Sequence, residues 1–310
     1  MMLREITETK YFHFFGKNQH PFISKEFISL NRHKAEDVVY LTEDIDKPSV
    51  GLIAGIKEHA LLAPFSAPFG GFHYRNEQVY ISETEKFVMY LKEYMSLNNH
   101  EKIHITFPPS IYGTTANSKM ISSMIRNGFK TEIPDITNYI DLNAFSGKFS
   151  QRNSREYLQQ AIRSGLRFSE LKENKSRLQV YNLIVENRKR FNRPIFMSFE
   201  DIENTGKLWP VDYYGVFDLN GELLAGGIFY RFSMDIVYAL FWGDNELGRP
   251  KRAMDFLSFN LWNLYKESGK KWIDLGISTE NGGIPNEGLL RFKETHEAVS
   301  ELRFRLSWNI

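Results

Sequence analysis

The chain has 310 residues, of which 42% are hydrophobic and 25% charged, values ordinary for a globular protein. At about 150 residues per domain, this length suggests two domains. The absence of cysteine excludes a disulfide framework, thiolate zinc sites and a cysteine nucleophile. Lys plus Arg number 39 against 38 for Asp plus Glu, so the net charge of +1 provides no broad attraction to nucleic acid or to an anionic membrane.

Targeting signals are not evident in the sequence. Charged residues such as Arg4, Glu5 and Glu8 interrupt the first 20 residues, which therefore lack the apolar run of a signal peptide. No stretch of about 18 apolar residues occurs, so we expect no membrane-spanning segment. These features predict a cytoplasmic protein.

The first half of the chain alternates between strand and helix patterns. Period-two alternation predicts strands at residues 37–41, 50–56, 102–107 and 138–142. Apolar residues at helical spacing predict helices at residues 83–94 and 117–126. A loop rich in Pro, Gly and Phe lies between the second strand and the first helix, at residues 64–72.

A basic segment follows, and the order of elements then repeats. Two helices are predicted in the basic segment, at residues 154–164 and 176–191. The second half begins with a hairpin around Asn220–Gly221, a strong two-residue turn signal. Further strands are predicted at residues 236–242, 271–275 and 301–308, and helices at residues 252–268 and 286–294.

The repeated order predicts the fold class. We expect an α/β protein, with mixed sheets of the α+β kind, built from two tandem modules without evident residue identity between them. The first module would cover residues 1–149, a helical basic connection residues 150–195, and the second module residues 196–310. Strands joined through a helix would be parallel, whereas hairpin strands would be antiparallel.

Four segments, in this order and spacing, resemble the FemAB-like acyltransferase family, whose members contain tandem domains of the GNAT N-acetyltransferase fold. The matching segments are APFGGF at residues 67–72, RNSREYLQQAIRSG at 152–165, LLAGGIFYRF at 223–232, and WIDLGIS at 272–278 followed by NEGLLRFKE at 286–294. The resemblance implies two modules like acyl-CoA N-acyltransferases, the second carrying the acyl-transfer site. It also implies that Lys293 faces the acyl group and stabilises the developing oxyanion.

The other candidate residues follow from their positions in the predicted elements. Asp274 lies at the carboxyl end of a strand, where ligands of α/β sheets bind, and would orient an amine nucleophile. Gly276 and Ser278 would approach the substrate at the same place. Phe69 and Gly70 would line an acceptor channel. Four more residues are candidates for the general base that accepts the amine proton, and the sequence favours none of them over the others: Asp212, Tyr214, Asp244 and Glu246.

Basic residues suggest two anion-binding regions. The start of the helix at 252–268 has unpaired backbone N–H groups and a positive dipole end, which together suit a phosphate or carboxylate. Gly248, Arg249, Lys251 and Arg252 would complete this cofactor site. Arg152 and the other cations of the linker helices would contact a phosphorylated acceptor or RNA.

Each of these residues also has an ordinary structural interpretation. Asp274 would satisfy a buried turn, Lys293 and Arg152 would be solvated, and Phe69 would pack within its loop. Two departures from the family pattern widen the alternatives. The segment after Lys293 lacks the family's glycine-aromatic-glycine stretch, and the loop at residues 245–250 keeps only one of the phosphate-loop glycines.

The sequence therefore predicts an acyltransferase that moves an acyl or aminoacyl group directly, through a tetrahedral intermediate, onto an amine of a cell-envelope or polysaccharide precursor. The acceptor would be a small molecule or a glycan or peptide precursor. Acyl-CoA, such as acetyl-CoA, and aminoacyl-tRNA remain alternative donors, although the net charge does not favour tRNA. No metal is expected, because the eight histidines are scattered and none stands in a zincin pattern, and the P-loop and nucleophile-elbow motifs of other chemistries are absent as well. The alternative is a catalytically inactive binding or scaffold protein of the same fold.

Overall fold

The computed structural model describes residues 3–16 and 21–310. Residues 1, 2 and 17–20, which belong to the segment considered above for a signal peptide, lie outside the described residues. The chain forms two compact units, one of residues 1–135 with 302–310 and the other of residues 136–301. Each unit contains a mixed sheet and helices, so the predicted α/β fold class is confirmed.

The first unit surrounds one sheet. Its helices are α1 (Glu8–Phe15), α2 (Lys25–Asn31), α3 (Ile81–Leu97) and α4 (Thr115–Arg126). Its strands are β1 (Arg4–Glu5), β2 (Asp37–Thr42), β3 (Val50–Lys57), β4 (Ala60–Ala63), β5 (Phe72–Tyr74), β6 (Lys102–Thr106), β7 (Lys130–Thr131) and β15 (Arg305–Asn309). The sheet order is β1-β2-β3-β4-β6-β15-β7, with β5 also paired to β3, and β4 and β6 are parallel.

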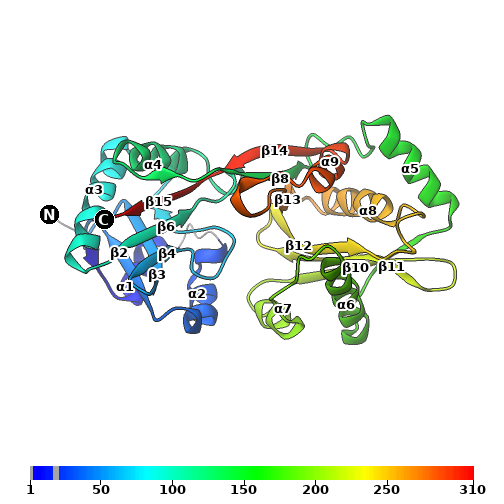
Figure 1. Cartoon of the computed structure of the whole chain (residues 1–310), viewed down its shortest axis with the longest axis horizontal. Helices are drawn as coiled ribbons and strands as arrows, with labels where there is room; N and C mark the ends of the chain where they lie inside the picture. Colours follow the sequence, from blue (N-terminus) through cyan, green and yellow to red (C-terminus); the bar gives the residue numbers. More distant parts are fainter. Residues whose placement is uncertain (1–2, 17–20) are drawn as a thin grey trace. The chain divides into compact units, whose positions relative to one another are not determined.

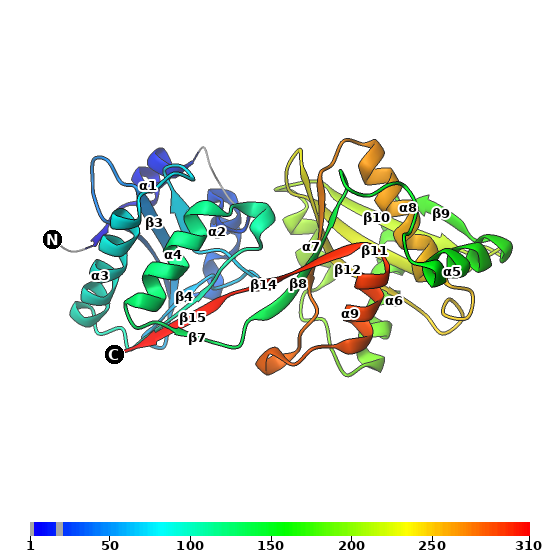
Figure 2. The same cartoon turned by 90° about the horizontal axis from the view of Figure 1, so that it is seen from above.

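Alternation along β2 explains how helices cover both faces of this sheet. Val39 and Leu41 point to the core beneath α3 and α4, whereas Val38 and Tyr40 point to a second core with α1 and α2. Successive strand residues face opposite sides, so a strand buried on both sides needs apolar residues at nearly every position. Figure 1 shows α1 and α2 on the face opposite α3 and α4. Figure 2 shows α3 and α4 side by side across the strands.

The second unit has the same plan. Its helices are α5 (Arg152–Arg163), α6 (Asn174–Arg190), α7 (Phe199–Thr205), α8 (Ala253–Glu267) and α9 (Glu287–Thr295). Its strands are β8 (Asp135–Asp141), β9 (Arg167–Glu170), β10 (Val211–Phe217), β11 (Leu223–Arg231), β12 (Ile236–Asp244), β13 (Trp272–Ile277) and β14 (Ala298–Arg303). The sheet order is β14-β8-β13-β12-β11-β10-β9. The hairpins are antiparallel and the helix-linked strands β12 and β13 are parallel, as predicted.

Helices also cover both faces of the second sheet. Leu257 and Leu261 of α8 share one core with Val216 of β10. On the other face α6 packs directly on β11, since a Cβ on Gly226 would come within 2.8 Å of Val180. Figure 1 shows α8 on one side of β10, β11 and β12 and α6 with α7 on the other.

Two strands pair differently from the sequence-based expectation. Strand β8, expected in the first module, lies between β13 and β14 in the second sheet, and β15 lies between β6 and β7 in the first. The predicted strand at 301–308 is in fact two strands, β14 and β15, in different sheets. Each sheet thus receives one strand from the other half of the chain. Alternation along a segment identifies it as a strand but carries no information about its partner.

The predicted module boundaries also differ from the two units. The strand exchange moves the division from residue 149 to residue 135 and returns residues 302–310 to the first unit. Residues 150–195 do not form a separate connection. Leu158 and Ala161 of α5 are part of the core of the second unit, and α6 covers its sheet. The apolar residues whose spacing predicted helices in this basic segment are the residues that pack these helices onto the second unit.

A buried histidine in the first unit predicts a pH effect on stability. His73 is 2% exposed, its Nδ1 lies 2.9 Å from the Tyr11 hydroxyl, and its ring stacks on Phe15. Burial lowers the pKa of His73 from 6.5 to about 3, so the unfolded chain binds the proton first on acidification. We expect stability to fall below pH 6.5 by up to about 1.4 kcal/mol per pH unit.

Urea unfolding at pH 7 and pH 5 tests this expectation. The His73→Phe variant keeps an aromatic ring without a titratable group and should lose less stability between these two pH values than the wild type. The same loss in both proteins would contradict the assignment.

Candidate functional site

The second sheet opens between its two parallel strands. Residues Ile236 to Tyr238 of β12 pair with Trp272 to Asp274 of β13, and no later pair joins the two strands. Both strands continue beyond this point, to Asp244 and Ile277. Their carboxyl ends therefore separate, and ligands of α/β sheets bind at such ends.

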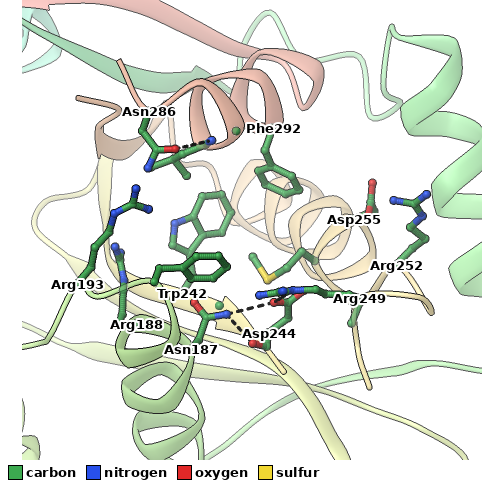
Figure 3. A pocket seen from close by; sticks show the side chains of 16 residues that line it. Asn187, Arg188, Arg193, Trp242, Asp244, Arg249, Arg252, Asp255, Asn286 and Phe292 are labelled. Carbon is green, nitrogen blue, oxygen red and sulfur yellow. Dashed lines mark hydrogen bonds and ion pairs between the residues drawn. The ribbon is translucent and has the colours of Figure 1, made fainter. Parts of the chain in front are cut away.

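A pocket of about 540 Å³ lies at the carboxyl end of β12. Its walls come from the end of α6 and the residues after it, the end of β12, the start of α8 and the start of α9 (Figure 3). Every lining residue belongs to the second unit. A volume of this size suits a small-molecule ligand or the reacting end of a larger one.

Aromatic side chains occupy the middle of this pocket. The rings of Trp242 and Phe292 meet edge to face, with centroids 5.6 Å apart. Figure 3 shows these two rings between Arg188 and Arg193 on one side and Arg252 and Asp255 on the other. Because the pocket is apolar in the middle and charged at both ends, it favours a ligand whose charged groups lie at a distance from its reacting group.

A buried His–Asp pair fixes the wall formed by α8 and α9. His296 Nδ1 lies 2.7 Å from the Phe292 carbonyl oxygen, and Nε2 lies 3.1 Å from Asp255 Oδ1. Because a carbonyl oxygen only accepts, Nδ1 carries a hydrogen, and the carboxylate is the partner of Nε2. The His296 ring also stacks on Phe292 at 4.0 Å. The end of α9 is thereby tied to the first turn of α8. Neither His296 nor Asp255 was predicted from the sequence, although His296 lies in the segment after Lys293 that departs from the family pattern.

The start of α8 offers positive charge. Arg252, its N-cap residue, has a left-handed backbone with φ of 61° and makes no side-chain capping bond. Its guanidinium lies over the Tyr157 ring at 3.6 Å, and among the described residues its Nε has no hydrogen-bond partner. Arg249 also lines the pocket, where its Nε lies 3.3 Å from Asp244 Oδ1. The N–H of Ala253 donates to the Gly248 oxygen at 3.0 Å, and the N–H groups that follow it in the first turn lack intrahelical acceptors, so this end suits an anion.

Asp244 is the acidic group at the end of β12. Asn187 Nδ2 donates to its backbone oxygen at 2.6 Å and to its Oδ1 at 3.2 Å. Burial raises the pKa of Asp244, against the opposing effect of the Arg249 guanidinium. A carboxylate with a raised pKa is a better proton acceptor than an exposed one.

Solved structures with the same fold cover nearly the whole chain. The structure of FemX matches with a TM-score of 0.66 at 11% identity, over 100% of this chain and 98% of that one. The C-terminal domain of a putative lysylphosphatidylglycerol synthetase from Agrobacterium fabrum matches with a TM-score of 0.59 at 14% identity, over 97% and 90% of the two chains. A tandem GNAT protein from the clavulanic acid biosynthesis pathway matches with a TM-score of 0.52 at 8% identity, over 88% and 82%. No family model and no curated protein sequence matches the chain.

The chain has the FemAB-like tandem GNAT fold. This agrees with the resemblance seen in the sequence, and it concerns the fold, because the identities are low. Within the tandem GNAT fold, β12, α8 and β13 form the strand–helix–strand element that carries the pocket of the second unit.

Three predicted residues of the second GNAT unit come together behind β13. Gly276 N–H donates to Asp274 Oδ1 at 2.8 Å. This bond closes a buried turn, which is the structural role considered for Asp274 in the sequence. Lys293 Nζ donates to the carbonyl oxygens of Gly276 and Ile277 at 2.9 and 3.0 Å. Lys293 is 1% exposed, so it is not a solvated surface lysine. Burial lowers the pKa of Lys293 to about 7, partly opposed by Asp274, and Lys293 does not line the pocket.

Two of the four predicted cofactor residues do not line the pocket. Gly248 is part of the loop before α8, where its N–H donates to Asn245 Oδ1 at 2.8 Å. A Cβ at Gly248 would lie 2.5 Å from the Leu224 oxygen, so the close approach of two backbones explains this glycine. Lys251 Nζ lies 3.1 Å from Asp218 Oδ2 in the hairpin turn. Arg249 and Arg252 remain as the basic residues of the predicted cofactor site.

The predicted substrate-binding residues are more scattered. Ser278 is buried and donates to Asn138 Oδ1. Arg152 is exposed on α5 and bonds to Glu156. Phe69 is buried in the first unit against Phe22 and Tyr112, and Gly70 lies beside it.

The remaining proton-acceptor candidates lie outside the pocket. Asp212 is bonded by Tyr265 and Arg231, Tyr214 is buried in the core of the second unit, and Glu246 lies 3.6 Å from Arg190. Within residues 3–16 and 21–310, no group of three His, Asp or Glu side chains is placed to hold a metal ion. In the same part of the chain, no helix has the length and apolar character needed to cross a membrane.

Proposed function

We propose that this protein transfers an acyl or aminoacyl group from a phosphate-bearing donor to an amine, and that the donor binds in the pocket of the second unit. One observation carries the proposal. Arg252, with no carboxylate partner in the described chain, stands at the start of α8, which has no side-chain cap, and lines an aromatic pocket at the carboxyl end of β12, the strand that separates there from β13. Donor phosphates would bind at the helix start, and the acyl end would reach the opening between the strands.

Direct transfer needs few protein groups. The amine nitrogen attacks the carbonyl carbon, the nitrogen gives up a proton, and the thiol or hydroxyl of the donor leaves with one. Asp244 is the group we propose to accept the amine proton, because it lines the pocket and burial raises its pKa. Lys293 would act indirectly, by holding the Gly276 and Ile277 carbonyls and so fixing the end of β13.

The donor and acceptor classes follow from chemistry and from fold relatives. Both coenzyme A and the 3′ end of aminoacyl-tRNA combine phosphates with a transferable acyl group, and the cationic start of α8 fits either. Similar folds occur in a putative lysylphosphatidylglycerol synthetase and in a protein described as a tandem GNAT protein solved without AcCoA. The first name supports an acceptor from the cell envelope, whether glycan, peptide or lipid, and the amine is the acceptor group that the resemblance to N-acyltransferases implies.

Thermal unfolding with candidate donors tests the proposal. A donor at about 100 times its dissociation constant adds about 2.7 kcal/mol to native-state stability. Since each kcal/mol raises the melting temperature of units of this size by roughly 2–4 °C, the melting temperature should rise by several degrees. We expect such a rise with coenzyme A thioesters or with aminoacyl-tRNA, together with transfer of labelled acyl group to an amine.

Two variants separate the donor site from general charge effects. Arg252→Gln should abolish the rise, while Arg163→Gln, which removes an exposed cation of α5, should retain it. The absence of any rise or transfer with either donor class would contradict the proposal and favour a catalytically inactive scaffold.

A further inference from the structure

We infer that the pocket has a second anion subsite, formed by Arg188 and Arg193, which binds a phosphate group carried by the amine acceptor. The inference rests on the proposed transferase function and deepens it, since it names the chemical class of the acceptor. It depends on residues that the predicted site did not include.

The two arginines lie across the pocket from the proposed donor end. Arg188 is in the last turn of α6 and Arg193 is three residues beyond that helix. Both line the pocket. Figure 3 shows their guanidinium groups together on one side of Trp242, with Asn286 beside them, and Arg252 on the opposite side.

Arg188 lacks a counter-ion. No carboxylate in the described residues pairs with it, and its buried Nε has no hydrogen-bond partner. Burial, and then the neighbouring Arg193 guanidinium, lowers the pKa of Arg188. An arginine remains protonated in proteins, so this half-buried charge costs stability unless an anion compensates it. The other arginines of the pocket have partners of some kind: Arg193 binds Glu280, Arg249 binds Asp244, and Arg252 stacks on Tyr157.

Two guanidinium groups side by side favour a phosphate. The Glu280 carboxylate balances one of the two positive charges. The charge of Arg188 and the N–H groups of Arg193 that do not bind Glu280 remain available to a phosphate. Guanidinium groups bind phosphate oxygens in a bidentate manner, and a phosphate monoester carries close to two negative charges near pH 7. Asn286 adds amide donors, because its Oδ1 already accepts from Leu289 N–H.

The position of this subsite assigns it to the acceptor. In the proposed reaction the acyl carbon lies where β12 and β13 separate, with the donor phosphates at the start of α8 on one side. A group held by Arg188 lies on the other side of the Trp242 and Phe292 rings. An amine with its own phosphate would then be anchored at Arg188 while the amine reaches the acyl carbon and Asp244.

Calorimetric titration of the full chain at constant ionic strength tests the inference. The probe is phosphoethanolamine, an amine with a phosphate, compared with ethanolamine and with β-alanine, which carries a carboxylate instead. We expect phosphoethanolamine to bind more tightly than both. Arg188→Gln should weaken this binding at least tenfold, whereas Lys189→Gln, one residue further along the same helix and outside the pocket, should not change it.

Two further measurements locate the bound phosphate. Saturating coenzyme A should leave phosphoethanolamine binding intact, and so should Arg252→Gln. Displacement of phosphoethanolamine by coenzyme A would overturn the inference, and so would equal affinity of the wild type and Arg188→Gln for phosphoethanolamine. Tighter binding of β-alanine than of phosphoethanolamine would overturn the assignment of the subsite to a phosphate. If no donor binds but phosphoethanolamine binding still depends on Arg188, the subsite stands and the proposed transfer fails. Arg193→Gln serves as a second variant if Arg188→Gln does not fold.

Discussion

Replacing Asp135 by Asn should lower the free energy of unfolding of the first unit by about 3–5 kcal/mol. Asp135 is 1% exposed, and its Oδ2 lies 2.8 Å from Arg303 NH2. Arg303 is itself buried and also donates to the Pro68 carbonyl oxygen at 3.1 Å. Without the carboxylate, the Arg303 charge would stay buried with no counter-ion. Removal of one member of a buried pair is far more costly than loss of an exposed pair.

Glu132 provides the matched control for this experiment. It lies 3.8 Å from Arg305, which also pairs with Asp135, but Glu132 is 37% exposed. Glu132→Gln should therefore cost less than about 1 kcal/mol. Chemical denaturation of both variants gives the comparison, and a similar small loss in the two would show that the Asp135–Arg303 pair contributes no more than a surface pair.

Replacing Lys293 by Met should lower acyl-transfer turnover by about 100-fold, the cost of a small misplacement of the reacting groups. Lys293 Nζ holds the carbonyls of Gly276 and Ile277 at the end of β13, while the side chain itself is buried outside the pocket. Loss of both hydrogen bonds would release the end of β13, beside the proposed transfer site.

Lys266 is a close structural control. It also donates to two backbone carbonyls of the second unit, those of Leu142 and Phe145, but these carbonyls follow β8 and are not at the end of β13. Lys266→Met should leave turnover within a few-fold of the wild type. Unchanged turnover in Lys293→Met, with a normal fold, would refute the role of Lys293.

The lowered pKa of Lys293 also makes the stability of the folded protein depend on pH, with a sign that follows from the direction of the pKa shift. The pKa of this lysine in the folded protein is lower than the 10.5 of the unfolded chain, so the unfolded chain binds more protons between pH 7 and pH 10.5. The contribution of Lys293 to stability should therefore rise with pH across this window. Lys293→Met should lack that rise, which separates the titration of the lysine from its part in turnover.

Local patterns in the sequence were sufficient for most elements of the fold. The periodicities of strands and helices identified β2, β3, β6, α3, α4, α8 and β13 close to their observed limits. The same patterns missed short or irregular elements such as α1, β4 and α7, which contain too few residues for a period to show. The resemblance to FemAB-like proteins correctly indicated the tandem GNAT fold.

For the candidate site, the sequence placed Arg249 and Arg252 correctly at the start of α8. It also placed Asp274, Gly276 and Lys293 close together, because all three belong to the same strand–loop–helix segment of the chain. It did not reveal that Arg188, Arg193 and Asp255 line one pocket or that His296 bonds to Asp255, since these residues come from α6, α8 and the segments after α6 and α9 and meet only after packing.

The sequence by itself determined which segments become strands and helices, and where a basic helix start occurs along the chain. These properties depend on residues within a few positions of one another, through hydrophobic period, turn residues and capping. Only the tertiary structure decided that β8 and β15 exchange between sheets and that Arg188 meets the pocket without a counter-ion. Strand partners and charge compensation depend on contacts between residues far apart in the chain, and no local period encodes them.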